Sequence, residues 1–110
     1  MKVTITSRHF KAHQSLNEYA EDAVLRLTKY YDGIIKAEVI LRFEKSRNSS
    51  KDAEINISVY NAVLTGRGTT NDFFRSIDAA FLRLREQLKK YKDRLHARDR
   101  KKVRSVREKI

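Results

Sequence analysis

Basic side chains recur through the chain at spacings that gather them on the surface of helices. Arg83, Lys90 and Arg94 are seven and four residues apart, so a helix would place them on one face, with Gln87 between them. Cationic groups on one surface bind phosphates, and such a surface fits a folded RNA without reading its bases. Each cation taken alone could equally be a solvent-facing charge. The candidate RNA-binding residues are Arg26, Lys29, Arg83, Arg85, Lys89, Lys90, Lys92 and Arg94.

No group of residues in the sequence has the composition of a catalytic or metal site. His9 and His13 are four residues apart, which would suit a metal only on a helix, and they fall in a predicted loop. The run Gly66–Gly68 lacks the third glycine and the strand-to-helix context of a nucleotide-binding loop, so it is interpreted as an edge strand. The acids are scattered along polar faces. We therefore expect neither enzymatic activity nor a cofactor.

The positive charge is concentrated in the C-terminal quarter of the chain. The 110 residues include 25 Lys and Arg against 14 Asp and Glu, a net charge of +11. Residues 1–81 hold 12 basic and 10 acidic side chains, whereas residues 82–110 hold 13 basic and 4 acidic ones. An excess this polarised favours a polyanionic partner such as a nucleic acid. The alternative is a solvated helix that keeps the protein soluble.

The length suits one domain, and the absence of cysteine excludes disulfides and thiolate metal sites. The sequence has no membrane-spanning apolar run and no apolar core of a signal peptide. We expect a cytoplasmic protein that is monomeric when free and has no membrane or small-molecule partner.

Alternating and helical patterns predict four strands and two helices. A capping box at Ser15–Glu18 is predicted to start the first helix, which should end near Asp32 with Gly33 in a left-handed conformation. A hairpin should have its mobile tip within residues 45–52, and Asn61-Ala62 should make a second tight turn. The predicted strands are 1–7, 37–44, 53–60 and 63–68.

The second helix should follow possible N-caps at residues 69–72 and be held by an apolar stripe. The stripe fails after residue 95, so we expect one domain of residues 1–95 and a basic tail, 96–110, that is frayed helix or disordered. The element order predicts an α+β fold, β-α-β-β-β-α, with a four-stranded mixed sheet and both helices on one face. The stripe residues are Phe74, Ile77, Phe81, Leu84, Leu88, Tyr91 and Leu95.

About residues 1–95 resemble the ribosome hibernation-promoting factors, also called ribosome-associated translation inhibitors. The most specific stretch is Asp72–Asp78, followed by a helix rich in Lys and Arg with Gln87-Leu88 and Lys92–Arg94. The resemblance implies a fold similar to double-stranded RNA-binding domains. It also implies binding to the small ribosomal subunit, where the protein would occlude the messenger and transfer RNA site and stabilise idle ribosomes under stress.

The chain departs from the family pattern at three positions. Ala23 stands where the first helix commonly has a basic residue, Glu86 replaces the usual Arg before Gln-Leu, and Leu82 replaces an acid. A short-form relative has an acidic tail, whereas residues 96–110 are basic here. This tail could extend the RNA contact or serve as a solubilising end. The alternative function is that of a structured-RNA-binding regulatory module without specificity for ribosomes.

Overall fold

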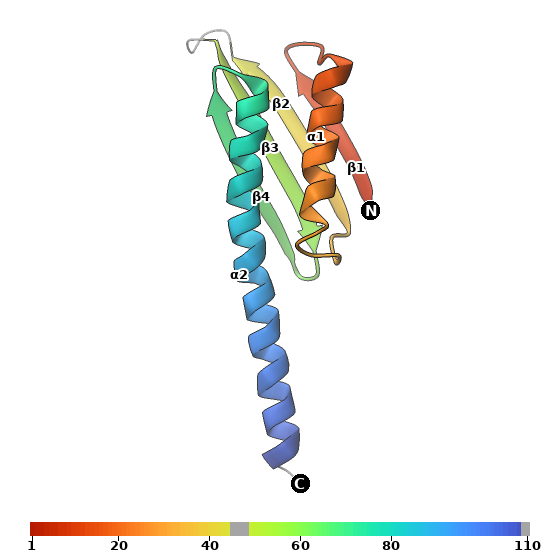
Figure 1. Ribbon diagram of the computed structural model, residues 1–110, viewed down its shortest axis with the longest axis vertical. Coiled ribbons are helices and arrows are strands. Elements are labelled where there is room, and N and C mark those ends of the chain that lie inside the picture. The colour runs from red at the N-terminus through yellow and green to blue at the C-terminus, as the bar shows by residue number, and fades with distance from the viewer. Residues whose placement is uncertain (45–48, 109–110) are drawn as a thin grey trace.

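A computed structural model describes the backbone of residues 1–44 and 49–108 and the side chains of residues 1–44 and 49–95. Strand β1 (Lys2–Arg8) is followed by helix α1 (Gln14–Leu27) and strands β2 (Lys36–Glu44), β3 (Ser50–Val59) and β4 (Ala62–Thr70). Helix α2 (Phe73–Glu108) ends the chain and projects well beyond the sheet (Figure 1).

The four strands form one mixed sheet in the order β1-β2-β3-β4. β1 pairs with β2 in parallel, and the β2–β3 and β3–β4 pairs are antiparallel. Both helices lie on the same face of the sheet, with α2 over β3 and β4 and α1 beside it toward β1 (Figure 1). The predicted fold class and element order are therefore confirmed.

The core lies between this helical layer and the alternating inward side chains of the sheet. Val39 and Leu41 of β2 and Ile55 and Ile57 of β3 are fully buried there. On β4 the inward positions include glycines, which let α2 approach closely. A methyl group at Gly66 would collide with the carbonyl oxygen of Ala80, and one at Gly68 with that of Ser76. The small residues of β4 thus set the position of α2 against the sheet edge.

The predicted bounds of the first helix are wrong at both ends. The helix begins at Gln14 with His13 as an N-cap that makes no side-chain hydrogen bond, so Ser15 forms no capping box. The helix ends at Leu27, and Gly33 has no positive φ. At this end the three successive amides of residues 28–30 donate to carbonyls three residues back, so the chain leaves the α-helix through a tighter turn. The Thr28 hydroxyl also donates to the carbonyl of Leu25 (2.6 Å).

The turn between β3 and β4 and the start of α2 also differ in detail from expectation. Val59 pairs with Ala62, so the turn residues are Tyr60 and Asn61, and Asn61 takes a left-handed φ of 62°. Asp72 is the N-cap of α2, because its Oδ1 accepts from the amide of Phe74 (3.0 Å). This cap orients Phe73 rather than Phe74 into the core. Phe74 is 39% exposed, and its predicted place in the apolar stripe is wrong.

Two predictions concern segments whose description is incomplete. Residues 45–48 of the expected hairpin tip lie outside the described residues, while β2 and β3 flank them as predicted. Helix α2 continues past Leu95 to Glu108. The division into a domain of residues 1–95 and a tail of residues 96–110 stays a prediction.

Candidate nucleic-acid interface

The two helices lie side by side and run in the same direction (Figure 1). Hollows lined by Tyr30 and by cations of α2 lie along their junction, which we call the groove. Near its upper end the Tyr19 hydroxyl of α1 donates to Oδ1 of Asp78 on α2 (2.6 Å). This hydrogen bond raises the pKa of Tyr19 above its ordinary value of 10.0, and burial and the negative charge of Asp78 add to the rise, whereas Arg26 opposes it. Farther along, the Arg26 guanidinium lies 4.9 Å from the centroid of the Phe81 ring. A hydrogen bond and a cation–π contact thus hold α1 against α2.

Cations of both helices border the lower part of this groove. Because α1 ends at Leu27, Lys29 lies in the turn after the helix. Lys29 and Lys92 line one hollow with Tyr30, and Arg85 and Lys89 line another with Tyr30 and Lys92. Nζ of Lys92 donates to the carbonyl oxygen of Tyr30 (2.6 Å), which ties α2 to the turn. We call these cations the groove cluster; its members are Arg26, Lys29, Arg85, Lys89 and Lys92.

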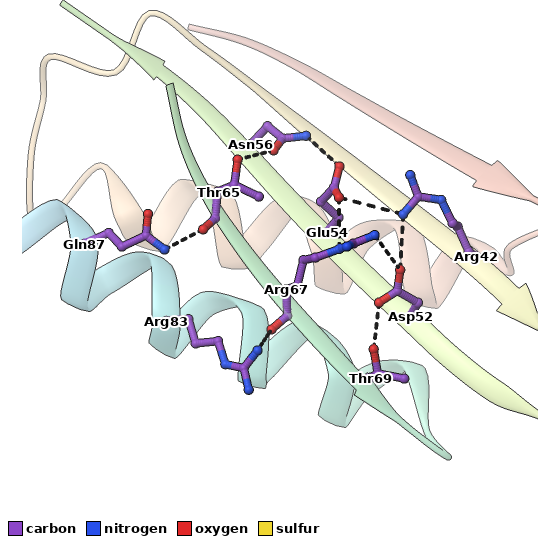
Figure 2. A network of polar contacts seen from close by, with 9 residues as sticks. All are labelled: Arg42, Asp52, Glu54, Asn56, Thr65, Arg67, Thr69, Arg83 and Gln87. Carbon is purple, nitrogen blue, oxygen red and sulfur yellow. Dashed lines mark hydrogen bonds and ion pairs between the residues drawn. The ribbon is translucent and has the colours of Figure 1, made fainter. Parts of the chain in front are cut away.

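The other three candidate residues lie on the side of α2 that faces β4. Arg83, Lys90 and Arg94 share a helical face, as predicted, and we call them the outer flank. Nη1 of Arg83 donates to the carbonyl oxygen of Arg67 on β4 (2.8 Å), and the Gln87 amide donates to the carbonyl oxygen of Thr65 (Figure 2). Two side chains of α2 therefore satisfy carbonyls at the sheet edge, a role that the sequence did not indicate.

The outer surface of α2 between the groove cluster and the outer flank also carries residues that are not cations. Leu82, Glu86 and Asp93 are exposed, and their spacings of four and seven residues place them in one line on the outer surface of α2. This line lies opposite the buried Leu84 and Leu88. Because Lys89 is seven residues after Leu82 and Lys90 is four after Glu86, cations adjoin this line on both sides.

The open face of the sheet carries charges that neutralise one another. Arg42 of β2 contacts Asp52 (3.2 Å) and Glu54 (3.8 Å) of β3, and Arg67 of β4 contacts the same two acids at 3.7 and 3.1 Å (Figure 2). Thr69 adds a hydrogen bond to Asp52 (2.8 Å). This network was not predicted from the sequence, although Arg42 faces Asp52 and Glu54 faces Arg67 in the strand register.

Arg42 and Arg67 at the centre of the open face are partnered differently from the cations of the helical layer. Among the residues with described side chains, every ion pair within 4.0 Å belongs to the open-face network of Arg42, Arg67, Asp52 and Glu54. No member of the groove cluster or the outer flank makes an ion pair with another residue whose side chain the structure describes. Cations that lack an acid within reach are available to an external anion, which is the chemistry that RNA phosphates require.

The part of the chain that the structure describes was also compared with the requirements of a metal site and of a membrane-spanning helix. No group of three or more His, Asp or Glu side chains there could hold a metal ion. Within the same residues, no helix has the length and apolar character needed to span a membrane.

Comparison with known proteins identifies one matching family and several similar sequences. The family model described as Sigma 54 modulation protein / S30EA ribosomal protein matches residues 3–96. The chain is 28% identical over 95 residues to the ribosome hibernation promoting factor of Escherichia coli strain K12, covering 86% of this chain and 97% of that protein. It is 27% identical over 94 residues to the factor of the same name from Pseudomonas putida, covering 86% and 89% of the two chains.

Solved structures show the same architecture. A ribosomal subunit interface protein from Coxiella burnetii superposes with a TM-score of 0.76 at 22% identity, covering 84% of this chain and 99% of that chain. The N-terminal domain of Thermus thermophilus Protein Y superposes with a TM-score of 0.73 at 25% identity, covering 83% and 99% of the two chains.

Proposed function

Because this chain belongs to the Sigma 54 modulation protein / S30EA ribosomal protein family, we propose that it binds the small ribosomal subunit through its helical layer. The family resemblance seen in the sequence is confirmed by the match. The observation that supports the proposed surface most directly is a contrast in ion pairing. The cations of the two helical flanks make no ion pair with any described side chain, whereas Asp52 and Glu54 neutralise Arg42 and Arg67 on the open sheet face. RNA phosphates would take the place of the missing acids.

The proposed mechanism is occlusion. A folded protein about 25 by 18 Å in cross-section would fill the messenger and transfer RNA site, exclude both RNAs and keep idle ribosomes intact during stress. Such inhibition requires bulk, shape and charge, and no catalytic residue or cofactor takes part. The names of the Escherichia coli and Pseudomonas putida relatives support a role in ribosome hibernation. We propose that the free protein is a monomer in the cytoplasm.

Charge reversal on each flank tests this proposal. The outer-flank variant is Lys90→Glu/Arg94→Glu, and the groove variant is Lys29→Glu/Lys89→Glu; all four residues are exposed. Each pair should weaken co-sedimentation with small subunits and reduce the salt dependence of log K by roughly two, because each lost phosphate contact removes about one. Stability should change by less than about 0.5 kcal/mol per site at such positions.

A matched control separates position from net charge. Lys2→Glu/Lys36→Glu makes the same change in charge at two exposed residues that are paired on the open face of the sheet. This control should bind nearly as well as the unmodified protein. If all three variants lose affinity equally, only net charge matters and the proposed surface is wrong. Equal binding to small subunits and to any duplex RNA would instead favour a general RNA-binding module. If the mechanism is occlusion, small subunits that already carry transfer RNA should not bind the protein.

A further inference from the structure

Tyr30 is an exposed aromatic residue whose position is nevertheless fixed. Its amide donates to the carbonyl oxygen of Leu27 (3.0 Å), and its own carbonyl oxygen accepts from Nζ of Lys92 (2.6 Å). Its ring makes an edge contact with Phe81, with the centroids 6.4 Å apart. Even so, Tyr30 is 43% exposed. A ring that is held in place and still accessible offers a contact surface with little entropy left to lose on binding.

The hollow beside this ring is rich in unpaired cations. It has a volume of about 310 Å³ and is lined by Tyr30, Arg85, Glu86, Lys89 and Lys92. The Arg85 guanidinium carbon lies 5.9 Å from the centroid of the Tyr30 ring. None of the three cations makes an ion pair with any residue whose side chain the structure describes, and Glu86 is the one acid of the lining. The hollow combines an aromatic face, anion-binding groups and a single carboxylate.

We propose that this hollow binds one unstacked nucleotide. The base stacks against the Tyr30 ring beside the Arg85 guanidinium, and the phosphate contacts Lys89 and Lys92. The Glu86 carboxylate accepts a hydrogen bond from an exocyclic amino group, which favours adenine, cytosine or guanine over uracil. This inference rests on the proposed RNA contact of the helical layer and adds to it a specific subsite within the groove cluster.

The aromatic component distinguishes this site from a simple phosphate contact. In a double-stranded RNA helix the bases are stacked within the duplex, so an exposed ring adds nothing to the binding of its backbone. A single-stranded or bulged nucleotide can present its base face to Tyr30, and stacking on an aromatic side chain is sequence-tolerant. The hollow should therefore discriminate single-stranded from fully paired RNA.

The experiment measures binding of a fluorescent single-stranded oligoadenylate and of a fully paired RNA hairpin by anisotropy at low salt. Tyr30→Ala should weaken binding of the oligoadenylate by about 5- to 150-fold, the range expected for the loss of one stacked base. Binding of the hairpin should be unchanged. Tyr30→Phe keeps the ring and should retain the affinity. Tyr60→Ala removes a more exposed tyrosine (67%) in the β3–β4 turn and is the matched control; it should have no effect.

Equal effects of Tyr30→Ala on both RNAs, or no effect on either, would overturn the proposal. Competition with adenosine monophosphate and with inorganic phosphate identifies the source of the nucleotide. Displacement by the mononucleotide at lower concentration than by phosphate supports a site open to free nucleotides, whereas displacement only by oligoadenylate supports a site for RNA. Co-sedimentation of the unmodified protein with small subunits is measured in parallel. If the unmodified protein does not bind small subunits, the proposed function is wrong. If it binds them but Tyr30→Ala does not weaken oligoadenylate binding, only the proposed nucleotide site is wrong.

Discussion

At the scale of single residues, Ser76 joins three segments of the chain through one buried hydroxyl group. Its Oγ donates to the carbonyl oxygen of Lys51 on β3 (2.6 Å) and accepts from the amide of Thr70 (3.1 Å). The side chain is fully buried on α2. A buried polar group that loses its partner costs the free energy of its desolvation, so this hydroxyl holds the first turn of α2 against the sheet.

Ser76→Ala should lower the free energy of unfolding by about 1–3 kcal/mol, because it leaves a partly buried amide and a partly buried carbonyl without their hydroxyl partner. Denaturant unfolding measures this change. Ser15→Ala is the control, since Ser15 is exposed and makes no cap; it should change stability by less than about 0.5 kcal/mol. A loss of about 1 kcal/mol at Ser15 would show that the capping box forms after all.

At the scale of elements, the contact of α2 with the edge of β4 is the feature that the sequence did not reveal. Free carbonyl and amide groups at a sheet edge are a template for pairing with another chain. Here Arg83 and Gln87 donate to the edge carbonyls of Arg67 and Thr65. The helix thereby covers the edge with polar side chains, which is consistent with the proposed monomeric state.

Arg83→Ala/Gln87→Ala should destabilise the protein by about 1 kcal/mol for each lost hydrogen bond and expose the edge of β4. We expect self-association that increases with protein concentration, measured by analytical ultracentrifugation, and faster hydrogen exchange in β4. Lys90→Ala removes a neighbouring cation of the same flank that does not contact β4, and it should have neither effect. A double variant that stays monomeric and equally stable would mean that the two hydrogen bonds contribute nothing to edge protection.

The elements themselves could be predicted from the sequence, because their signals are local. Alternation along Ile55, Ile57 and Val59 and the heptad-like spacing of Ile77, Leu84 and Leu88 each depend on residues close in the chain. The end of α1 was missed because the chain leaves the helix through i→i−3 hydrogen bonds at residues 28–30, which the apolar periodicity does not indicate.

The candidate site was predictable as a set of cations but not as a geometry. Helical spacing correctly placed Arg83, Lys90 and Arg94 on one face. The acceptor for Arg83 is a backbone carbonyl of β4, and its identity follows only from the packing of α2 on the sheet. The position of Tyr30 likewise depends on the end of α1 and on a bond from Lys92, which is 62 residues away in the chain. Such long-range pairings carry no local signal.

At the scale of the whole molecule, helix α2 extends the positive charge of the chain beyond the folded core. The folded part ends its core at Leu88, whereas the helix extends to Glu108 and beyond the sheet (Figure 1). Residues 96–110 contribute seven Lys and Arg against two acids. A helical extension of this kind can carry cations to phosphates that the folded part does not reach, so we favour the tail as an RNA contact over a purely solubilising end.

Deletion of residues 96–110 should therefore reduce both the affinity for small subunits and the salt dependence of log K, by more than the roughly two units expected for a pair of charge reversals. The melting temperature should hardly change, because every core residue among the described side chains precedes residue 95. Replacement of all Lys and Arg in 96–110 by Gln keeps the length and should reproduce the deletion if charge is the cause. If the salt dependence is unaffected and only solubility falls, the tail is a solubilising end and RNA contact is confined to the two helical flanks.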